Sequence, residues 1–176
     1  VQDDATLDDA LRLASRHGFQ PCVHAIGDRA NARVLDLFER LVSEGLTLSR
    51  PRIEHAQVLR PEDVIRFRSL DVRASMQPIH AVSDRRHAAS RLGPERLRGA
   101  YAWRALHEAG VRLAFGSDVP VESADPLLGL RAAVCGRDVD GEPPGGFLPA
   151  NWIAPDDALA AYTSGAAAAG VDEALA

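Results

Sequence analysis

Short apolar segments alternate with longer amphipathic segments along this chain, and glycines mark many of the joints between them. The short segments predict strands, because a run of about four to eight apolar residues suits a buried strand. Regular alternation of strands and helices is typical of a parallel sheet joined by crossover helices. The sequence therefore predicts one α/β domain with parallel strands over residues 19–28, 51–56, 71–76 and 111–116.

The intervening helices are predicted from apolar residues at helical spacing, from proline at a first helical position and from glycine beyond the last turn. The clearest one, residues 29–44, places Val34, Leu37, Phe38 and Leu41 on one face. Further helices are predicted over residues 6–17, 61–69, 94–109 and 126–134, and from residue 155 onward. The stretch SDRRHAAS (83–90) is interpreted as a solvated loop, and the Gly/Pro-rich residues 136–154 as a long loop.

Composition and charge exclude several classes of function. The 20 basic residues against 25 acidic ones give a net charge of -5 without a basic stripe, which argues against a nucleic-acid partner. No apolar run reaches the ~20 residues that span a bilayer, so we expect no membrane association and a cytoplasmic protein. All 20 basic residues are arginine, so this chain offers no lysine for a Schiff base or a carboxylated metal bridge. Cys22 and Cys135 form no CxxC pair and no disulfide framework.

Histidine and carboxylate side chains stand where the predicted strands end. His24 and His55 close the first two strands, His80 follows the third, and Asp118 follows the fourth. The carboxyl ends of parallel strands share one edge, which is where α/β barrels keep their active sites. Neutral imidazoles with a carboxylate suit a divalent metal such as zinc. A histidine at a strand end can equally be a hydrogen-bonded structural residue, and both interpretations stay open on this pattern.

Side-chain alternation along a strand gives expected orientations for neighbouring residues. If His55 points inward, Ile53 shares its face, and Glu54 points toward the helices, where a buried carboxylate needs an arginine partner. Asp28 precedes the helix over residues 29–44, so we interpret it as the N-cap in preference to a hydrogen-bond partner of His24.

Five segments, in their order and spacing, resemble the C-terminal half of the catalytic barrel of the amidohydrolase superfamily: residues 24–39, 51–59, 75–80, 91–134 and 159–170. They look most like amidohydrolase family 3, which includes N-substituted formamide deformylase-like enzymes. The resemblance implies a partial TIM barrel, strands five to eight of a (β/α)8 metal-dependent hydrolase. It also implies that His24, His55 and Asp118 bind metal, that Asp118 is the general base, and that His80 contacts the substrate.

The chain departs from that family pattern in two respects. Members begin their metal site with an HxH pair on the first strand, and many add a carboxylated lysine or a glutamate, whereas this sequence contains no HxH pair. Members also carry a small β-sandwich, which would begin near residues 171–176. Because a full barrel takes about 250 residues, we expect residues 1–176 to be the C-terminal barrel half, without the N-terminal half and the sandwich.

The expected function follows from this resemblance. We expect a fragment of a metal-dependent hydrolase that cleaves C–N bonds of amide-like, non-peptide small molecules with a metal-activated water. The fragment alone is expected to be inactive. One alternative is a non-catalytic half-barrel that self-associates to cover its open edges, and a homo-oligomer is expected on the same grounds. Another is a regulatory relative without activity.

Overall fold

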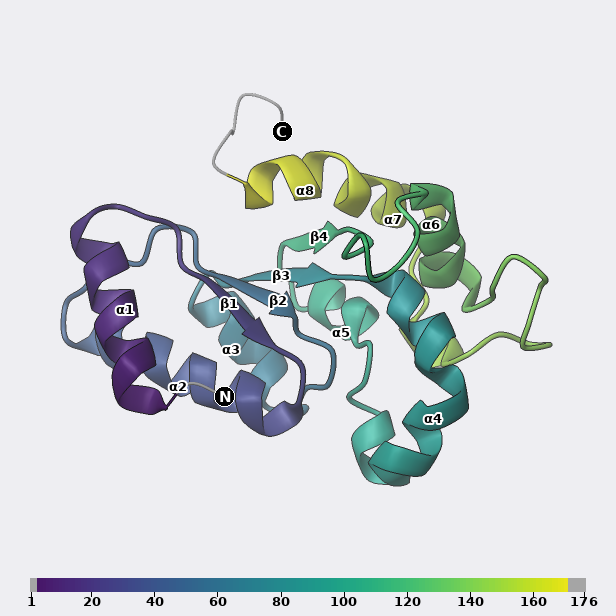
Figure 1. The fold of residues 1–176 in the computed structure, drawn as a ribbon, viewed down its shortest axis with the longest axis horizontal. Helices are drawn as coiled ribbons and strands as arrows, with labels where there is room; N and C mark the ends of the chain where they lie inside the picture. The colour runs from purple at the N-terminus through teal and green to yellow at the C-terminus, as the bar shows by residue number, and fades with distance from the viewer. Residues whose placement is uncertain (1–2, 171–176) are drawn as a thin grey trace.

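The computed structural model describes residues 3–170 and contains a four-stranded parallel sheet (Figure 1). The strands pair in chain order, β1 (Cys22–Ala25), β2 (Arg52–His55), β3 (Arg73–Met76) and β4 (Leu113–Phe115). The predicted α/β class and all four predicted strands are confirmed, although each strand is shorter than the apolar run that predicted it.

Helices join the strands and cover the sheet. They are α1 (Asp4–Arg16), α2 (Asp28–Ser43), α3 (Asp63–Ser69), α4 (Pro78–Leu97), α5 (Trp103–Glu108), α6 (Pro126–Cys135), the 3-10 turn η1 (Pro149–Asn151), α7 (Pro155–Tyr162) and α8 (Ser164–Ala169). In Figure 1, α2, α3 and α5 lie on one side of the sheet, and α7 and α8 run along the edge strand β4. None of the helices within residues 3–170 has the length and hydrophobicity needed to span a bilayer.

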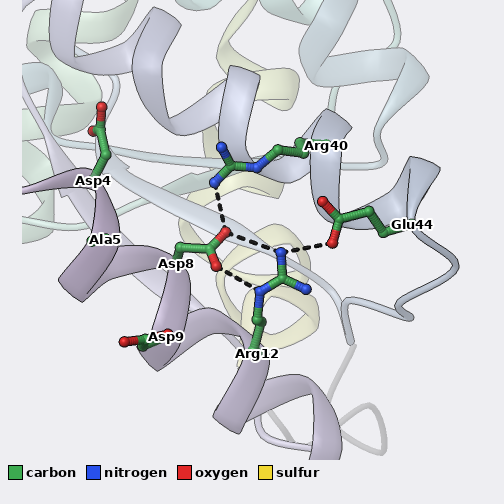
Figure 2. A pocket seen from close by; sticks show the side chains of 7 residues that line it. All are labelled: Asp4, Ala5, Asp8, Asp9, Arg12, Arg40 and Glu44. Atoms are coloured by element: carbon green, nitrogen blue, oxygen red, sulfur yellow. Dashed lines mark hydrogen bonds and ion pairs between the residues drawn. The ribbon is translucent and has the colours of Figure 1, made fainter.

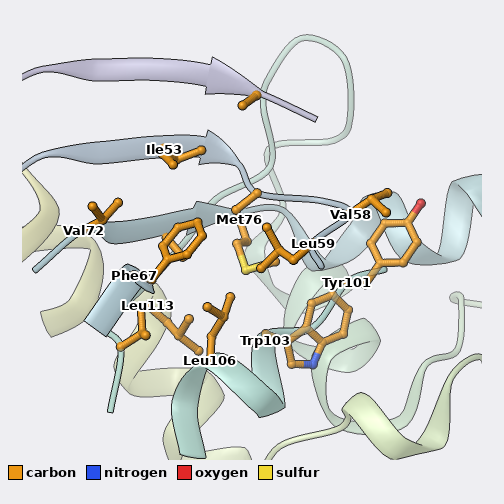
Figure 3. Close-up of a cluster of buried hydrophobic side chains, with 14 of the residues drawn as sticks. Ile53, Val58, Leu59, Phe67, Val72, Met76, Tyr101, Trp103, Leu106 and Leu113 are labelled. Carbon is orange, nitrogen blue, oxygen red and sulfur yellow. The ribbon is translucent and has the colours of Figure 1, made fainter. Parts of the chain in front are cut away.

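The hydrophobic core lies between the sheet and the helices α3 and α5 (Figure 3). Ile53, Met76 and Leu113 come from three neighbouring strands and are at most 7% exposed. They point toward Phe67 of α3 and Leu106 of α5, both fully buried. Because successive strand residues alternate between faces, this face is the covered one, and the opposite face carries the residues between them.

The helix α2 confirms the clearest helical prediction, shifted by one residue at each end. The four residues predicted to share its apolar face, Val34, Leu37, Phe38 and Leu41, are all at most 5% exposed. The chain leaves the helix at Gly45, where φ is 85°, a left-handed conformation that glycine adopts without a Cβ penalty.

The predicted helix over residues 94–109 is divided between the end of α4 and α5, and the predicted loop over residues 83–90 is wrong. Residues 83–90, including His87, belong to the long helix α4, whose last turn lies beyond a kink at Gly93 (φ 71°). The chain then turns through Tyr101, whose φ is 53°, before α5 begins. The error has a physical cause: α4 buries few and mostly small side chains, Pro78, Ala81, Val82 and Ala88, so its sequence shows no clear helical period of apolar residues.

The last part of the chain follows the prediction more closely. The helix over 126–134 is confirmed as α6, and residues 136–154 form the predicted long loop apart from η1. The helix predicted from Pro155 onward is divided at Thr163, whose φ of -115° and ψ of -94° are not helical. Residues 171–176, where a sandwich segment was expected to begin, lie outside the described residues.

Candidate metal centre

The carboxyl ends of the strands bring three potential ligand residues together. His55 ends β2, His80 lies in the first turn of α4 after β3, and Asp118 follows β4. Each offers a nitrogen or oxygen atom, and these atoms all lie within 4.8 Å of one another. The structure thus brings together three of the four residues singled out from the sequence.

The backbone at the end of β2 explains how His55 reaches this group. In the sheet register His24 pairs with Glu54, and Ile53 is buried in the helix-covered core. The expectation that Ile53 shares the face of His55, with Glu54 turned toward the helices, is therefore wrong. At His55 φ is 73°, so the strand's alternation ends there. Glu54 does have an arginine partner, Arg52, whose Nε lies 2.5 Å from Oε1.

His80 has an unusual environment for a structural histidine. Its Nε2 atom is buried and has no hydrogen-bond partner among the described residues. The Asp118 Oδ2 atom lies 4.0 Å from it, too far for a hydrogen bond. The His80 ring stacks on the His55 ring, with centroids 5.9 Å apart and an interplanar angle of 17°. Leaving a buried ring nitrogen unpaired is costly, which favours a ligand or ion at this point.

His24 lies beside this group but outside the set of three. Its ring meets the His55 ring edge to face, with centroids 4.6 Å apart. His24 is exposed and lines a hollow of about 490 Å³ along the edge strand β1, together with Cys22 and Val23. Burial raises the pKa of the Cys22 thiol, which argues against a thiolate nucleophile there. The compact cluster thus contains His80 and not His24, which the family resemblance implied as a ligand.

Side chains that the sequence pattern did not single out complete the surroundings. Gln77 Oε1 lies 2.9 Å from His55 Nδ1. Tyr101 donates its hydroxyl hydrogen to Asp84 Oδ2 at 2.7 Å, and Gln57 Nε2 donates to the same oxygen at 2.9 Å. Gln57 lies two residues beyond the end of β2 and Gln77 one residue beyond the end of β3, and this closeness to a strand end is the signal by which the sequence marks them.

Asp28 is neither the N-cap of α2 nor a bonded partner of His24. Gly27 occupies the N-cap position, and Asp28 is the first residue of the helix. Its carboxylate accepts hydrogen bonds from Arg96 at 2.8 and 3.1 Å, and from the Arg29 backbone N–H at 2.7 Å. Partial burial raises the pKa of Asp28, but the bonds from Arg96 and Arg29 outweigh it and bring the pKa below its usual value.

A second hollow, of about 450 Å³, lies between α1 and α2 (Figure 2). Four of its charged side chains form ion pairs with one another. Arg12 contacts Asp8 at 2.5 Å and Glu44 at 2.6 Å, and Arg40 contacts Asp8 at 2.6 Å. The hydrogen bond from Arg12 lowers the pKa of Asp8. This network ties α1 to α2 and leaves the strand ends as the candidate functional site.

A family model described as amidohydrolase matches residues 1–174. This chain belongs to the amidohydrolase family. The amidohydrolase chain is 37% identical over 171 residues to Protein LONG AFTER FAR-RED 3 of Arabidopsis thaliana. It is 34% identical over 167 residues to the putative amidohydrolase YtcJ of Bacillus subtilis. These matches cover 96% and 95% of this chain but 29% and 31% of those proteins, so the chain spans just under a third of their length.

Solved structures with the same fold include two uncharacterized metal-dependent hydrolases. The one from Pyrococcus furiosus is 32% identical with a TM-score of 0.81, and the match covers 98% of this chain and 34% of that one. The one from Pyrococcus horikoshii is 33% identical with a TM-score of 0.82, covering 96% and 33%. A zinc-complexed atrazine chlorohydrolase from Arthrobacter aurescens, 18% identical with a TM-score of 0.62, shares the fold over 98% of this chain and 36% of its own. These neighbours and the cluster of His55, His80 and Asp118 support a divalent metal centre.

Proposed function

We propose that this amidohydrolase chain supplies the proton-transfer residue and part of the metal site of a metal-dependent hydrolase. The observation that carries the proposal is the convergence of His55, His80 and Asp118, whose ligand atoms lie within 4.8 Å of one another. The proposed reaction is hydrolysis of the C–N bond of an amide-like, non-peptide small molecule, of which an N-substituted formamide is an example.

The donor set fits a divalent cation. The imidazoles of His24 and His55, whose ring centroids lie 4.6 Å apart, and the carboxylate of Asp118 are ligands that zinc accepts readily. We assign His24, His55 and Asp118 as metal ligands and zinc as the metal. When bound, the cation would act as a Lewis acid that lowers the pKa of water and polarises the substrate carbonyl.

The chain's own side chains supply the remaining chemistry. Asp118 is 39% exposed at its side chain, so water and substrate can reach its carboxylate. As general base it would take the proton from the attacking water and then deliver it to the leaving nitrogen. His80 is held by α4, and its Nε2 has no hydrogen-bond partner among residues 3–170. It would contact the substrate carbonyl oxygen and stabilise the negative charge that develops there.

We also propose that β1 to β4 are strands five to eight of a (β/α)8 barrel. The support is the parallel, chain-order sheet, the helices packed on one face and the candidate site at the carboxyl ends of the strands. The proposed activity belongs to the whole protein, because the ligands of the other strands complete such a site.

Metal content tests the proposal directly. The purified chain, dialysed mildly, is analysed by elemental mass spectrometry alongside His55→Ala and the control His107→Ala. His107 is a good control because it lies on α5 and faces Asp157 at 3.4 Å, away from the strand ends. We expect bound zinc in the parent chain and in His107→Ala, and its loss in His55→Ala. Equal metal in all three proteins would overturn the site assignment.

A non-catalytic, self-associating module is the second candidate. The observation that favours it is the edge strand β1, which is bordered by the hollow of about 490 Å³ with apolar residues such as Leu7 and Val34 in its lining. An unpaired strand edge next to apolar side chains invites pairing with another copy. A dilution series in size-exclusion chromatography separates the two candidates, since a monomer at low micromolar concentration contradicts the module.

We also propose that the protein is located in the cytoplasm, which cell fractionation tests.

A further inference from the structure

Gln77 links two of the three clustered residues. It stands between the end of β3 and the start of α4. Its side-chain Oε1 lies 2.9 Å from His55 Nδ1, and its backbone oxygen accepts the His80 N–H at 3.0 Å. One residue therefore holds the ring of one histidine and the backbone of the other.

The contacts of the Gln77 amide define which of its atoms faces the ring. Its Nε2 lies 3.5 Å from the Ser75 carbonyl oxygen, an arrangement in which the amide N–H donates. A flipped amide would place Oε1 against that carbonyl, and two acceptors would repel each other. Oε1 therefore faces His55 and can only accept a hydrogen bond, so Nδ1 of the neutral ring must carry the proton.

Apart from the contacts with the His55 ring and the Ser75 carbonyl, the Gln77 side chain has no further hydrogen bond among residues 3–170. It sits at the N-cap position of α4, yet it makes no side-chain hydrogen bond to that helix. The ring that it contacts belongs to a residue that is 8% exposed, so water does not readily replace the amide as a partner. The hydrogen bond between Gln77 Oε1 and His55 Nδ1 therefore orients the His55 ring.

We propose that Gln77 is a positioning residue that fixes His55 as the Nδ1–H tautomer and leaves the Nε2 lone pair free for a cation. Neutral imidazole can bind a metal through one nitrogen only when the proton sits on the other. The inference rests on the proposed function where it gives the free lone pair to a metal. The tautomer itself is a property of the chain without metal.

The tautomer can be measured in the metal-free protein by nitrogen-15 correlation spectra of the histidine rings at pH 8, where imidazole is neutral. The His55 signals are assigned by their loss in His55→Ala. We expect Nδ1–H in the parent chain and a mixture of tautomers in Gln77→Met, which keeps the side-chain length but has no amide acceptor. Gln77→Glu restores an acceptor and should restore the Nδ1–H form.

Zinc affinity, measured by competition with a chromophoric chelator, provides the second readout. Loss of the acceptor should weaken binding by roughly 10- to 100-fold in Gln77→Met, and Gln77→Glu should recover most of it. Gln57→Met is the matched control, because Gln57 donates to Asp84 and Tyr101 at 2.9 and 3.1 Å and has no bond to a histidine ring. It should keep the parent tautomer and affinity.

The outcomes separate this inference from the proposed function. A pure Nδ1–H tautomer in Gln77→Met overturns the positioning role, whatever the metal affinity. Parent-level zinc affinity in Gln77→Met, with thermal stability unchanged, overturns the link between tautomer and metal. If the parent chain binds no divalent cation, the proposal that this chain alone holds a preformed part of the metal site fails, and the tautomer spectra still decide the role of Gln77.

Discussion

Replacing Gly99 with alanine should break the contact that holds the segment after β2 against the segment before α5. A Cβ atom at position 99 would lie 1.9 Å from the Leu59 carbonyl oxygen, a distance that real Cβ contacts do not show. The opposing atom belongs to the backbone, so no side-chain rotation can relieve the overlap. The two segments must separate.

The energetic cost follows from the hydrogen bonds that cross this contact. The Leu59 N–H donates to the Gly99 oxygen at 2.8 Å, and the Tyr101 N–H donates to the Gln57 oxygen at 2.7 Å. A separation of more than about 1 Å takes both bonds beyond hydrogen-bonding range. Leu59 and Tyr101 are each 3% exposed, so their polar groups would stay buried without partners. At about 1–3 kcal/mol for each of the two lost bonds, Gly99→Ala should lower the free energy of unfolding by roughly 2–6 kcal/mol.

Urea unfolding followed by tryptophan fluorescence measures this loss. The matched control is Gly116→Ala, since a Cβ atom at position 116 has no neighbour within 4 Å and the backbone there is not left-handed. The control should change the free energy of unfolding by less than about 1 kcal/mol. Similar losses in the two variants, or a loss below about 1 kcal/mol in Gly99→Ala, would show that the chain absorbs the added methyl group without breaking the contact.

Three further predictions concern the core, the tyrosines and the candidate base. Phe38 is fully buried, so Phe38→Ala should lower the free energy of unfolding by about 3–5 kcal/mol in urea titrations; a change below about 1 kcal/mol would contradict the packing. Burial raises the pKa of both Tyr101 and Tyr162 above the usual value of 10.0, and the bond to Asp84 adds to the shift at Tyr101. Folded protein therefore binds more protons than unfolded protein above that value, so stability should fall as pH rises past it, and ultraviolet titration should show both phenols ionising only with unfolding. Asp118→Asn in the whole protein should lower kcat by about 10²- to 10⁴-fold without changing thermal stability, and unchanged turnover would contradict its role as base.

The fold could be predicted where one local signal dominated. β1 to β4 and α2 follow apolar runs and a helical period that need no tertiary information. α4 could not be predicted in this way, because its long polar surface is stabilised by distant partners. Arg85, for example, pairs with Asp138 of the long loop at 2.7 Å, and Arg96 pairs with Asp28 at the start of α2. Such pairs join residues more than fifty positions apart, which a local pattern does not record.

The candidate site could be predicted only in outline. The positions of His55 and Asp118 at strand ends were enough to indicate a shared edge. The close approach of His80 depends on the direction in which α4 leaves β3, and the role of Gln77 depends on the same junction. The orientation of Glu54 was predicted wrongly because alternation was extended through His55, where the left-handed backbone ends it.

The same left-handed backbone strengthens the functional assignment. His55 and Asp118 have φ angles of 73° and 60°, a region that side chains with a Cβ atom enter at a cost of about 1–3 kcal/mol. Glycine adopts the same conformation at Gly45 and Gly110, and Tyr101 and Leu148 are among the other residues with a Cβ atom that do so. His55 and Asp118 differ from these residues because their donor atoms lie within 4.8 Å of each other and of a donor atom of His80. Retaining an imidazole and a carboxylate there, facing the unpartnered Nε2 of His80, is explained if their donor atoms have a ligand to hold.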